Sequence, residues 1–414
     1  MKEVKVIIAA NFGDEGKGLM TDYFCNKCDN PIVVRFNSGA QAGHTVVTPD
    51  GNRHVFGHFG SGTFNNTPTF LSKYFVVNPL SFLKELNELM KIGLNPQIYV
   101  DDECLITTPY DMIINQIVEI FRGKNNHGSC GLGFNETLVR NSKDRFKLKV
   151  KDILDINLNK TKVYEILMDI KNHYVNKRLK ELGVNNIDNE FKSILENNNL
   201  IFNFIEDIQD FIKDIKITSF KEINRKFTTL IFEGAQGLML HENYKYFPHV
   251  THSKTGIENV IELLNEVYSE FSNEAKNKVN IEVIYVTRSY LTRHGAGPLP
   301  GELNCAPYNK IVDLTNIPNR FQGCLRFALL DLDLLNENIY NDFNKVINSG
   351  YNIRKSLAIT CLDQIDNFAK YIFDNSLKES NLNTFINNVI NKIKPYRYYL
   401  SKGASRATIE MVEN

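Results

Sequence analysis

The chain has 414 residues, enough for two or three domains or for one large α/β domain. Its 48 Lys and Arg residues balance 48 Asp and Glu residues, which argues against nucleic acid or an anionic membrane surface as the main partner. With 43% hydrophobic and 23% charged residues, the composition is that of a folded globular protein and excludes an intrinsically disordered one.

The seven cysteines are odd in number and scattered, which favours a reducing cytoplasm over a secreted disulfide framework. Cys25 and Cys28 form a CxxC pair, but no second pair at zinc-site spacing accompanies them, so we interpret the pair as structural or accidental. The first apolar run is too short for a signal peptide, and no window approaches the ~18 apolar residues of a membrane span. We therefore expect a cytoplasmic protein.

Short apolar runs recur along the chain and predict strands buried in a parallel sheet. The first covers residues 4–9 and is followed by a glycine-rich turn and a helix-like stretch at 19–25. A second helix-like stretch ends at Lys91. The other apolar runs lie at 31–36, 75–77, 97–100, 228–232, 281–286 and 356–362. Because strands alternate with helical patterns, we predict an α/β fold with a large, mostly parallel central sheet flanked by helices.

The segment from about 149 to 226 has a different composition. Glycine nearly vanishes there, and Lys, Asn, Glu, Ile and Leu recur at helical spacing. We interpret residues 149–226 as a helical insertion between sheet strands, not as an independent catalytic unit. The sequence shows no internal repeat, and we expect a single catalytic domain over residues 1–414.

A glycine-rich loop with the sequence Asn-Phe-Gly-Asp-Glu-Gly-Lys-Gly follows the first predicted strand at residues 11–18. Glycines at a strand-to-helix turn let backbone N–H groups approach a phosphate, and the helix N-terminus and Lys17 add favourable charge. The pattern is not the GxxxxGK[ST] of P-loops, since the loop is shorter and Gly18 stands where a Mg²⁺-binding hydroxyl should be. A carboxylate in such a turn would repel a phosphate unless a metal or a proton transfer employs it. Asp14 is therefore a candidate base or metal ligand.

Four further loops combine small residues with polar side chains. His44, in the loop after the second strand, could act as a general acid or orient a phosphate. Gln236 lies among glycines, where an amide can bind a base edge or a ribose. Open α/β sheets bind ligands outside the carboxyl ends of their strands, so we expect these loops to meet there. The loops cover residues 39–45, 127–133, 233–237 and 292–298.

Four of these motifs, taken in order, resemble those of the adenylosuccinate synthetase family. They are FGDEGKG, AGHT, FEGAQG and TRHGAGPLPGEL, and the stretches from Thr251 to Val260, LAITCLDQID and the tail from Ser401 to Gly403 match as well. The resemblance runs over essentially the whole chain, with the helical region only loosely matched. It implies a P-loop-like, GTPase-related core. It also implies a ligase that joins aspartate to the 6-position of IMP, using GTP and Mg²⁺, and releases adenylosuccinate, GDP and phosphate.

The resemblance also assigns residues to roles. Asp14 matches the catalytic base and a magnesium ligand, His44 the general acid, and Lys17 a catalytic residue of the phosphate loop. The backbone of Gly43 matches a further metal contact. The positions implied to bind GTP are Gly13, Glu15, Gly16, Lys17, Gly18, Gly43, His44, Thr45, Asp363, Ser401 and Gly403. The positions implied to bind the nucleoside monophosphate are Asp14, Gln41, Ser129, Arg140, Gln236 and Thr251.

Two of these assignments carry a further implication. Asp363 matches an aspartate that recognises guanine. Arg140 is the nearest match to an arginine that reaches the monophosphate site of the other subunit, and the resemblance therefore implies a homodimer.

Several positions around the substrates depart from the family. The aspartate-binding loop usually carries consecutive arginines, but here Thr315 and Asn316 are followed by Arg320 alone. Either Arg293 or Arg326 completes the hold on aspartate, or neutral hydrogen bonds replace it. Smaller departures are Cys361 for a usual Lys, Ser129-Cys130 for Thr-Thr and Gln41 for Asn.

These departures leave several functions open. The leading hypothesis is a GTP-dependent ligase acting on a purine monophosphate with L-aspartate. The second is the same chemistry on dGMP, as in a bacteriophage branch of the family, or with another amino donor. In that branch the base Asp is commonly replaced, so Asp14 argues against full membership. The third is a nucleotide-binding relative without catalysis, against which the retained Asp14, Lys17 and His44 count. An isolated P-loop GTPase switch fits least, because the Walker spacing is absent.

Overall fold

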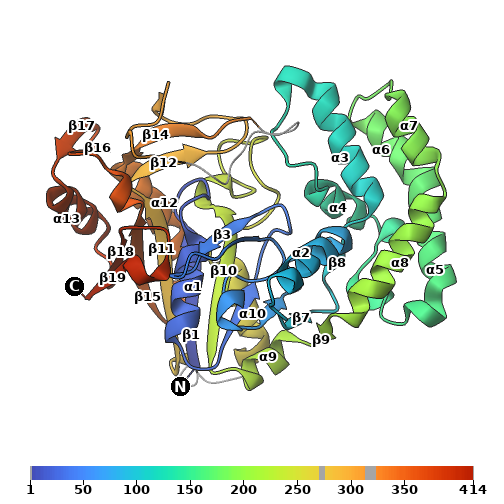
Figure 1. Ribbon diagram of the computed structural model, residues 1–414, viewed down its shortest axis with the longest axis horizontal. Coiled ribbons are helices and arrows are strands. Elements are labelled where there is room, and N and C mark those ends of the chain that lie inside the picture. The colour runs from blue at the N-terminus through green and yellow to red at the C-terminus, as the bar shows by residue number, and fades with distance from the viewer. Residues whose placement is uncertain (1, 270–275, 313–322, 414) are drawn as a thin grey trace.

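The computed structural model describes residues 2–269, 276–312 and 323–413. Within them, ten strands form one central sheet, and β1 lies between β10 and β11 (Figure 1). Neighbouring strands of this sheet run parallel except for the antiparallel pair β18 and β19. The prediction of a large, mostly parallel sheet flanked by helices is confirmed. From edge to edge the strands are β19 (Ile409–Glu413), β18 (Arg397–Ser401), β15 (Asn352–Thr360), β11 (Val279–Arg288), β1 (Lys2–Ala9), β10 (Thr229–Gly237), β2 (Pro31–Arg35), β5 (Thr69–Leu71), β7 (Ile98–Val100) and β9 (Lys216–Ile217).

Strand β1 is apolar throughout because both of its faces are covered. Successive side chains of a strand point to opposite faces, and here Val6 and Ile8 enter one hydrophobic core while Ile7 enters another. All three side chains are fully buried. The unbroken apolar run in the sequence is the consequence of these two cores.

Two predicted strands differ from the structure. The run at 75–77 forms β6 (Val76–Val77), which pairs with β8 (Leu105–Ile106) in a small separate sheet, and β5 takes the place in the central sheet. Strand β10 continues through the glycine-rich motif to Gly237, so this motif is the end of a strand and not a loop after it. Gly237 is required there, since a Cβ would lie 2.3 Å from the carbonyl oxygen of Asn11.

Helices cover both faces of the sheet, and α5 to α8 gather beyond α2 and α3 at one end of the molecule (Figure 1). Phe211 of α8 packs edge-on against Phe82 of α2, with ring centroids 4.9 Å apart, which joins these outer helices to the core. Among the described residues, no helix is both long and apolar enough to cross a membrane. The helices are α1 (Lys17–Lys27), α2 (Pro79–Lys91), α3 (Pro109–Arg122), α4 (Phe134–Asn141), α5 (Ile156–Asp169), α6 (Val175–Glu181), α7 (Asn189–Glu196), α8 (Asn199–Lys213), α9 (Phe220–Lys226), α10 (Glu258–Tyr268), α12 (Leu332–Asn344) and α13 (Leu382–Ile393).

A second sheet and a hairpin complete the described fold. In the second sheet β14 pairs with β12, β13 and β16, and β16 pairs with β17. The hairpin consists of β3 and β4, begins at His44, and lies beside the central sheet (Figure 1). These strands are β3 (His44–Val47), β4 (Arg53–Phe56), β12 (Tyr290–Arg293), β13 (Glu302–Leu303), β14 (Arg326–Asp331), β16 (Ala369–Phe373) and β17 (Ser376–Ser380).

Arg140 holds α4 against α3 and is fully buried. Its Nε donates to Asp111 at 2.9 Å, and its terminal nitrogens donate to Asp111 and to the carbonyls of Ile106 and Phe146. Asp111 also closes the capping box with Thr108 at the start of α3. The prediction that Arg140 reaches a nucleotide in a partner subunit is therefore wrong, because its donors are committed inside its own subunit.

We expect Arg140→Ala to lower the free energy of unfolding by about 3–5 kcal/mol, because it leaves the Asp111 carboxylate buried without its charged partner. The matched control is Arg145→Ala, whose exposed pair with Asp169 is worth less than about 1 kcal/mol. Urea unfolding of both variants measures the difference. Equal stability of the Arg140 variant and the wild type would contradict the structural role.

Candidate active site

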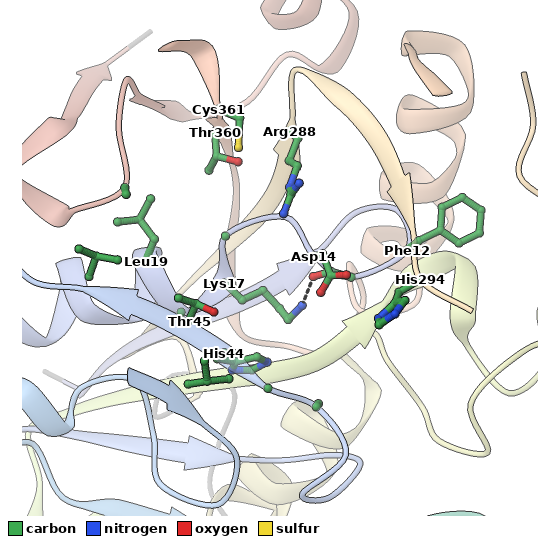
Figure 2. A pocket seen from close by; sticks show the side chains of 18 of the residues that line it. Phe12, Asp14, Lys17, Leu19, His44, Thr45, Arg288, His294, Thr360 and Cys361 are labelled. Carbon is green, nitrogen blue, oxygen red and sulfur yellow. Dashed lines mark hydrogen bonds between the residues drawn. The ribbon is translucent and has the colours of Figure 1, made fainter. Parts of the chain in front are cut away.

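A cavity of about 540 Å³ opens at the carboxyl ends of the central strands. Its lining comes from the loop after β1, the end of β10, Arg288 at the end of β11, and Thr360 and Cys361 at the end of β15. Figure 2 shows Asp14, Arg288, Thr360 and Cys361 around one space, with His44 on the opposite wall. Of the loops predicted to meet at this edge, those at 11–18, 39–45 and 292–298 line the cavity together with the 233–237 motif, whereas the 127–133 loop does not.

Helix α1 starts at this cavity without a side-chain cap. Its N-cap is Gly16 in the left-handed conformation, at φ 100°, and Lys17 and Gly18 of its first turn line the cavity. The first N–H groups of a helix have no partner within it, and the helix dipole adds positive potential there. This end of α1 can therefore receive a phosphate, as the glycine-rich loop predicted.

Glu15 lies in the same loop but points away from the cavity. Its carboxylate accepts hydrogen bonds from the backbone N–H groups of Asn11 and Phe12, each at 3.1 Å. Burial raises the pKa of Glu15 to about 7. The assignment of Glu15 to GTP binding does not fit this geometry, since its side chain shapes the loop and does not reach the ligand space.

Asp14 and Lys17 face the cavity together, with Arg288 on the adjacent wall (Figure 2). Lys17 Nζ donates to the carbonyl of Gly13, and burial lowers the pKa of Lys17. Among the described residues, nothing donates a hydrogen bond to the Asp14 carboxylate. Asp14 is therefore free to accept a proton or to bind a metal.

The donor set of the cavity fits Mg²⁺ of the kind that is shared with a substrate. Mg²⁺ in phosphate-transferring sites is held by one or two carboxylates together with phosphate oxygens and water. Asp14 supplies one carboxylate, and Gly43 also lines the cavity. In the part of the chain that the structure describes, no group of three or more His, Cys, Asp or Glu side chains could hold a metal alone.

His44 is buried and bonded to Glu233, a partner that the sequence analysis did not identify. The distance from His44 Nδ1 to Glu233 Oε1 is 2.7 Å, and Ser61 donates to the same carboxylate through its N–H and its hydroxyl. Burial alone would raise the pKa of Glu233, but the neighbouring His44, Arg35 and Ser61 lower it to about 2. Burial lowers the pKa of His44 to about 4 despite this partner. At neutral pH the imidazole is thus neutral, with Nδ1–H donating to Glu233.

The other ring nitrogen of His44 has no hydrogen-bond partner among the described residues, although it is buried. His44 lines the cavity, so this Nε2 can accept a proton there. A buried imidazole with one nitrogen fixed by a carboxylate has its tautomer and orientation set.

A second cavity of about 360 Å³ adjoins the first. It brings together Ser129 and Thr251, two of the residues assigned to the monophosphate. Four residues line both cavities, namely Gln41, Gln236, Leu240 and His294. The two cavities thus share a wall.

From the sequence we expected the loop at 127–133 to follow a strand. In the structure it follows α3 and a short 3₁₀ turn at Gly123–Asn125. Glu119 of α3 holds it by accepting from the N–H groups of Gly128 at 2.9 Å and Ser129 at 3.1 Å. Asn115 donates to the Ser129 hydroxyl at 2.7 Å. Glu119 and Asn115 of α3 therefore position Ser129 at the second cavity.

The remaining assigned residues divide into three groups. Gly13, Gly16, Gly18, Gly43, Thr45, Asp363 and Gly403 line the first cavity. Ser401 is buried and donates to the carbonyl of Gly403 at 2.9 Å, so it positions that turn and does not line the cavity. The aspartate-binding assignments Thr315, Asn316 and Arg320 lie outside the described residues.

Neither arginine proposed to complete the aspartate site is free to do so. Arg293 donates to the carbonyls of Ala296, Pro298 and His249. Arg326 pairs with Glu302 at 2.7 Å and donates to two loop carbonyls. Both side chains donate to backbone carbonyls of the 292–298 loop and so stabilise it. The sequence alone does not show these contacts.

From the sequence we did not single out two polar side chains at the site, Arg288 and Glu233. Their positions at the ends of predicted strands could have identified them. Arg288 is the last residue of β11, and Glu233 lies in β10 directly before a glycine. Polar residues at the carboxyl ends of buried parallel strands are natural candidates for a ligand site. What the sequence could not show is that Glu233 meets His44, 189 positions away.

The fold and the two cavities define the class: an α/β protein with a mostly parallel central sheet and a cavity at the carboxyl ends of its strands. A model of the adenylosuccinate synthetase family matches residues 6–370. The chain therefore belongs to the adenylosuccinate synthetase family.

Curated relatives agree with this membership. The chain is 29% identical over 304 residues to the adenylosuccinate synthetase of Clostridium botulinum and 30% identical over 302 residues to that of Clostridium beijerinckii. Each match covers 72% of this chain and 65% of the relative, so the chain matches less than two thirds of these proteins' length.

Two solved structures share the fold. The fully ligated adenylosuccinate synthetase from Plasmodium falciparum has a TM-score of 0.70 and 20% identity, over 98% of this chain and 99% of that chain. The cyanophage S-2L succinoaminodeoxyadenylate synthetase, solved with dGMP and dATP, has a TM-score of 0.60 and 12% identity, over 99% and 95%. Both agree with the fold class predicted from the sequence.

We expect acid to destabilise the protein through His44. The pKa of this group is about 4 when folded and about 6.5 when unfolded, so between these values the unfolded chain binds more protons. Its contribution is intact above pH 6.5 and is lost as the pH falls to 4, by about 3 kcal/mol. Urea unfolding of His44→Asn, compared with wild type from pH 7 to 4, measures the difference. The exposed His173→Asn should keep the wild-type slope, and an unchanged slope in His44→Asn would refute the assignment.

Proposed function

We propose that this chain is a GTP- and Mg²⁺-dependent ligase that joins L-aspartate to the 6-position of a purine nucleoside monophosphate, with IMP giving adenylosuccinate. The observation that carries the proposal is the shared wall of the two cavities. Asp14, Lys17 and His44 line the first cavity, and Gln41 and Gln236 line both. Such a site can hold a phosphate donor and a purine side by side, with a base and an acid between them.

The reaction needs the 6-oxygen to become a leaving group, since oxide is a poor one. Asp14 removes the ring proton beside the carbonyl, and the 6-oxygen then attacks the γ-phosphorus of GTP. The new O–P bond forms as the bond from the γ-phosphorus to the β–γ bridging oxygen breaks, and GDP leaves. The amine of aspartate next attacks C6, loses a proton, and the C6–O bond breaks to release phosphate.

The residues of the first cavity supply the charge that these steps require. Lys17 and the first N–H groups of α1 stabilise the negative charge that develops on the transferred phosphoryl group. Bound Mg²⁺ would neutralise further phosphate charge, with Asp14 and the backbone of Gly43 as its protein contacts.

His44 acts on the 6-oxygen in two stages. Its imidazole is neutral in the free protein, with Nε2 unprotonated, so it first takes up a proton as phosphate charge enters the cavity. The ionised Glu233 behind Nδ1 stabilises the imidazolium that forms, which can then donate to the leaving phosphate. Glu233 is thus a positioning residue for the acid.

A second candidate substrate is dGMP. The cyanophage S-2L protein that shares the fold was solved with dGMP bound. Against dGMP stands Asp14, whose carboxylate occupies the loop where that branch commonly has a smaller residue. A panel of IMP, GMP and dGMP with GTP or ATP and several amino acids, analysed by mass spectrometry, separates these candidates and identifies the amine donor.

The setting of the reaction also belongs to the proposal. A single catalytic domain and a homodimer remain predictions. Arg140 is not available to reach the partner's monophosphate site in such a dimer. All seven cysteines lie in the described residues as free thiols, which supports a reducing cytoplasm.

We expect Asp14→Asn to lower turnover by at least ~10²–10⁴-fold, because it removes the base and weakens metal binding. Nucleotide binding should persist, since the loop backbone is unchanged. The matched control is Asp188→Asn, which replaces the N-cap of α7 with an equally good cap and should leave turnover unchanged. Phosphate release measures both, and near wild-type release by Asp14→Asn would sink the assignment.

We expect GTP to be preferred over ATP through Asp363, which lines the first cavity. Its carboxylate can accept from the ring N–H and the amine of guanine, whereas adenine lacks this donor pair. Asp363→Ala should raise the KM for GTP by at least ~10-fold and leave the KM for the monophosphate unchanged. Equal use of ATP by the wild type, unaffected by the substitution, would contradict this.

A further inference from the structure

Four histidines line the second cavity. His294 is bonded through Nε2 to the carbonyl of Gly323, and the function proposed above gives the other three no role. His127 comes from the loop after α3, and His249 and His252 come from the segment between β10 and α10. The rings of His127 and His249 lie 5.4 Å apart between centroids. These three side chains line the cavity together with Ser129 and Thr251.

We propose that His127, His249 and His252 recognise the phosphate group of the purine monophosphate. This inference rests on the proposed function and deepens it, since it names how this chain holds that end of its substrate. The imidazoles take up protons when the phosphate dianion binds, so recognition depends on pH.

The other cations in the walls of this cavity already have partners. Arg178 is held by Glu136 at 2.7 and 3.2 Å, and Arg122 by Glu119 at 3.0 Å. The third arginine, Arg293, donates to three backbone carbonyls, including that of His249. An arriving dianion therefore finds its additional positive charge on the imidazoles.

The Nδ1 atom of His249 is buried and has no hydrogen-bond partner in the described part of the chain. A buried polar atom without a partner costs free energy, and a bound phosphate oxygen would satisfy it. A metal does not explain the cluster, since no metal-holding group of His, Cys, Asp or Glu occurs among the described residues.

The charges facing the three rings come from several elements. His127 faces Arg122, Glu119 and the other two histidines. His249 faces Arg293, Arg326 and Glu119, while His252 faces Glu242, Glu136 and Arg178. Burial lowers the pKa of His127 and of His249 from the usual 6.5, which favours the neutral imidazole in the free protein. A dianion brought against them favours their charged form and raises these pKa values.

The sign of proton exchange on binding is therefore diagnostic. The second ionisation of a phosphate monoester lies near pH 6, so a dianion bound at a fixed cationic site releases protons at pH 7. At a histidine site the complex takes protons up instead. Titration calorimetry of IMP binding in two buffers of different ionisation enthalpy measures this number directly.

We expect wild type to take up protons with IMP at pH 7 and to exchange none with inosine, which lacks the phosphate. The triple variant H127Q/H249Q/H252Q should lose this uptake and bind IMP at least tenfold more weakly. If the triple variant does not fold, the exposed His252→Gln alone should reduce the uptake. The control is His241→Gln, whose ring is paired with Glu258 outside the cavity, and it should leave the uptake unchanged.

Proton release by the wild type, or equal uptake by the triple variant, would overturn the inference. The same experiment needs no turnover, so it is independent of the ligation assay. Uptake that depends on the three histidines, in a protein that ligates nothing, would support phosphate recognition and reject the proposed function. Turnover without such uptake would do the reverse.

Discussion

The buried hydrogen bond between His44 and Glu233 connects the parts on which both cavities depend. Glu233 lies near the end of β10, while His44 begins the β3–β4 hairpin and Ser61 lies in the loop after it. An ionised carboxylate in the interior is stable only if donors surround it, and here an imidazole, a hydroxyl and a backbone N–H do so. The same contact fixes the hairpin beside the loop that carries Asp14. Charge compensation at one carboxylate thus sets the shape of the site.

Three acidic residues near this point behave differently because their donors differ. Glu233 is surrounded by cationic and hydroxyl groups, which hold its pKa at about 2. Glu15 accepts from two backbone N–H groups, and burial raises its pKa to about 7. Asp14 accepts no hydrogen bond from the described residues and faces the cavity. The first orients an imidazole, the second shapes a loop, and the third is left for chemistry.

Local patterns in the sequence predicted the parts of this fold that local physics determines. The unbroken apolar run at 4–9 and the glycine-rich loop after it identified β1 and the start of α1. Strand β5 was missed because three residues after a proline carry no periodicity. Arg140 was misassigned, because its neighbours in the sequence do not show that it is buried and paired with Asp111. The partnership of His44 with Glu233 depends on β10 crossing to lie beside β1, which only the tertiary fold creates.

The two cavities, although they share a wall, would hold their phosphates by different physics. The first offers the N–H groups of an uncapped helix and the ammonium group of Lys17. The second offers imidazoles, whose charge depends on the ligand itself. Arginines at the second cavity are consumed in ion pairs and loop carbonyls that stabilise its walls. With these arginines held in the walls of the second cavity, the imidazoles are the groups left to supply further positive charge to a bound phosphate.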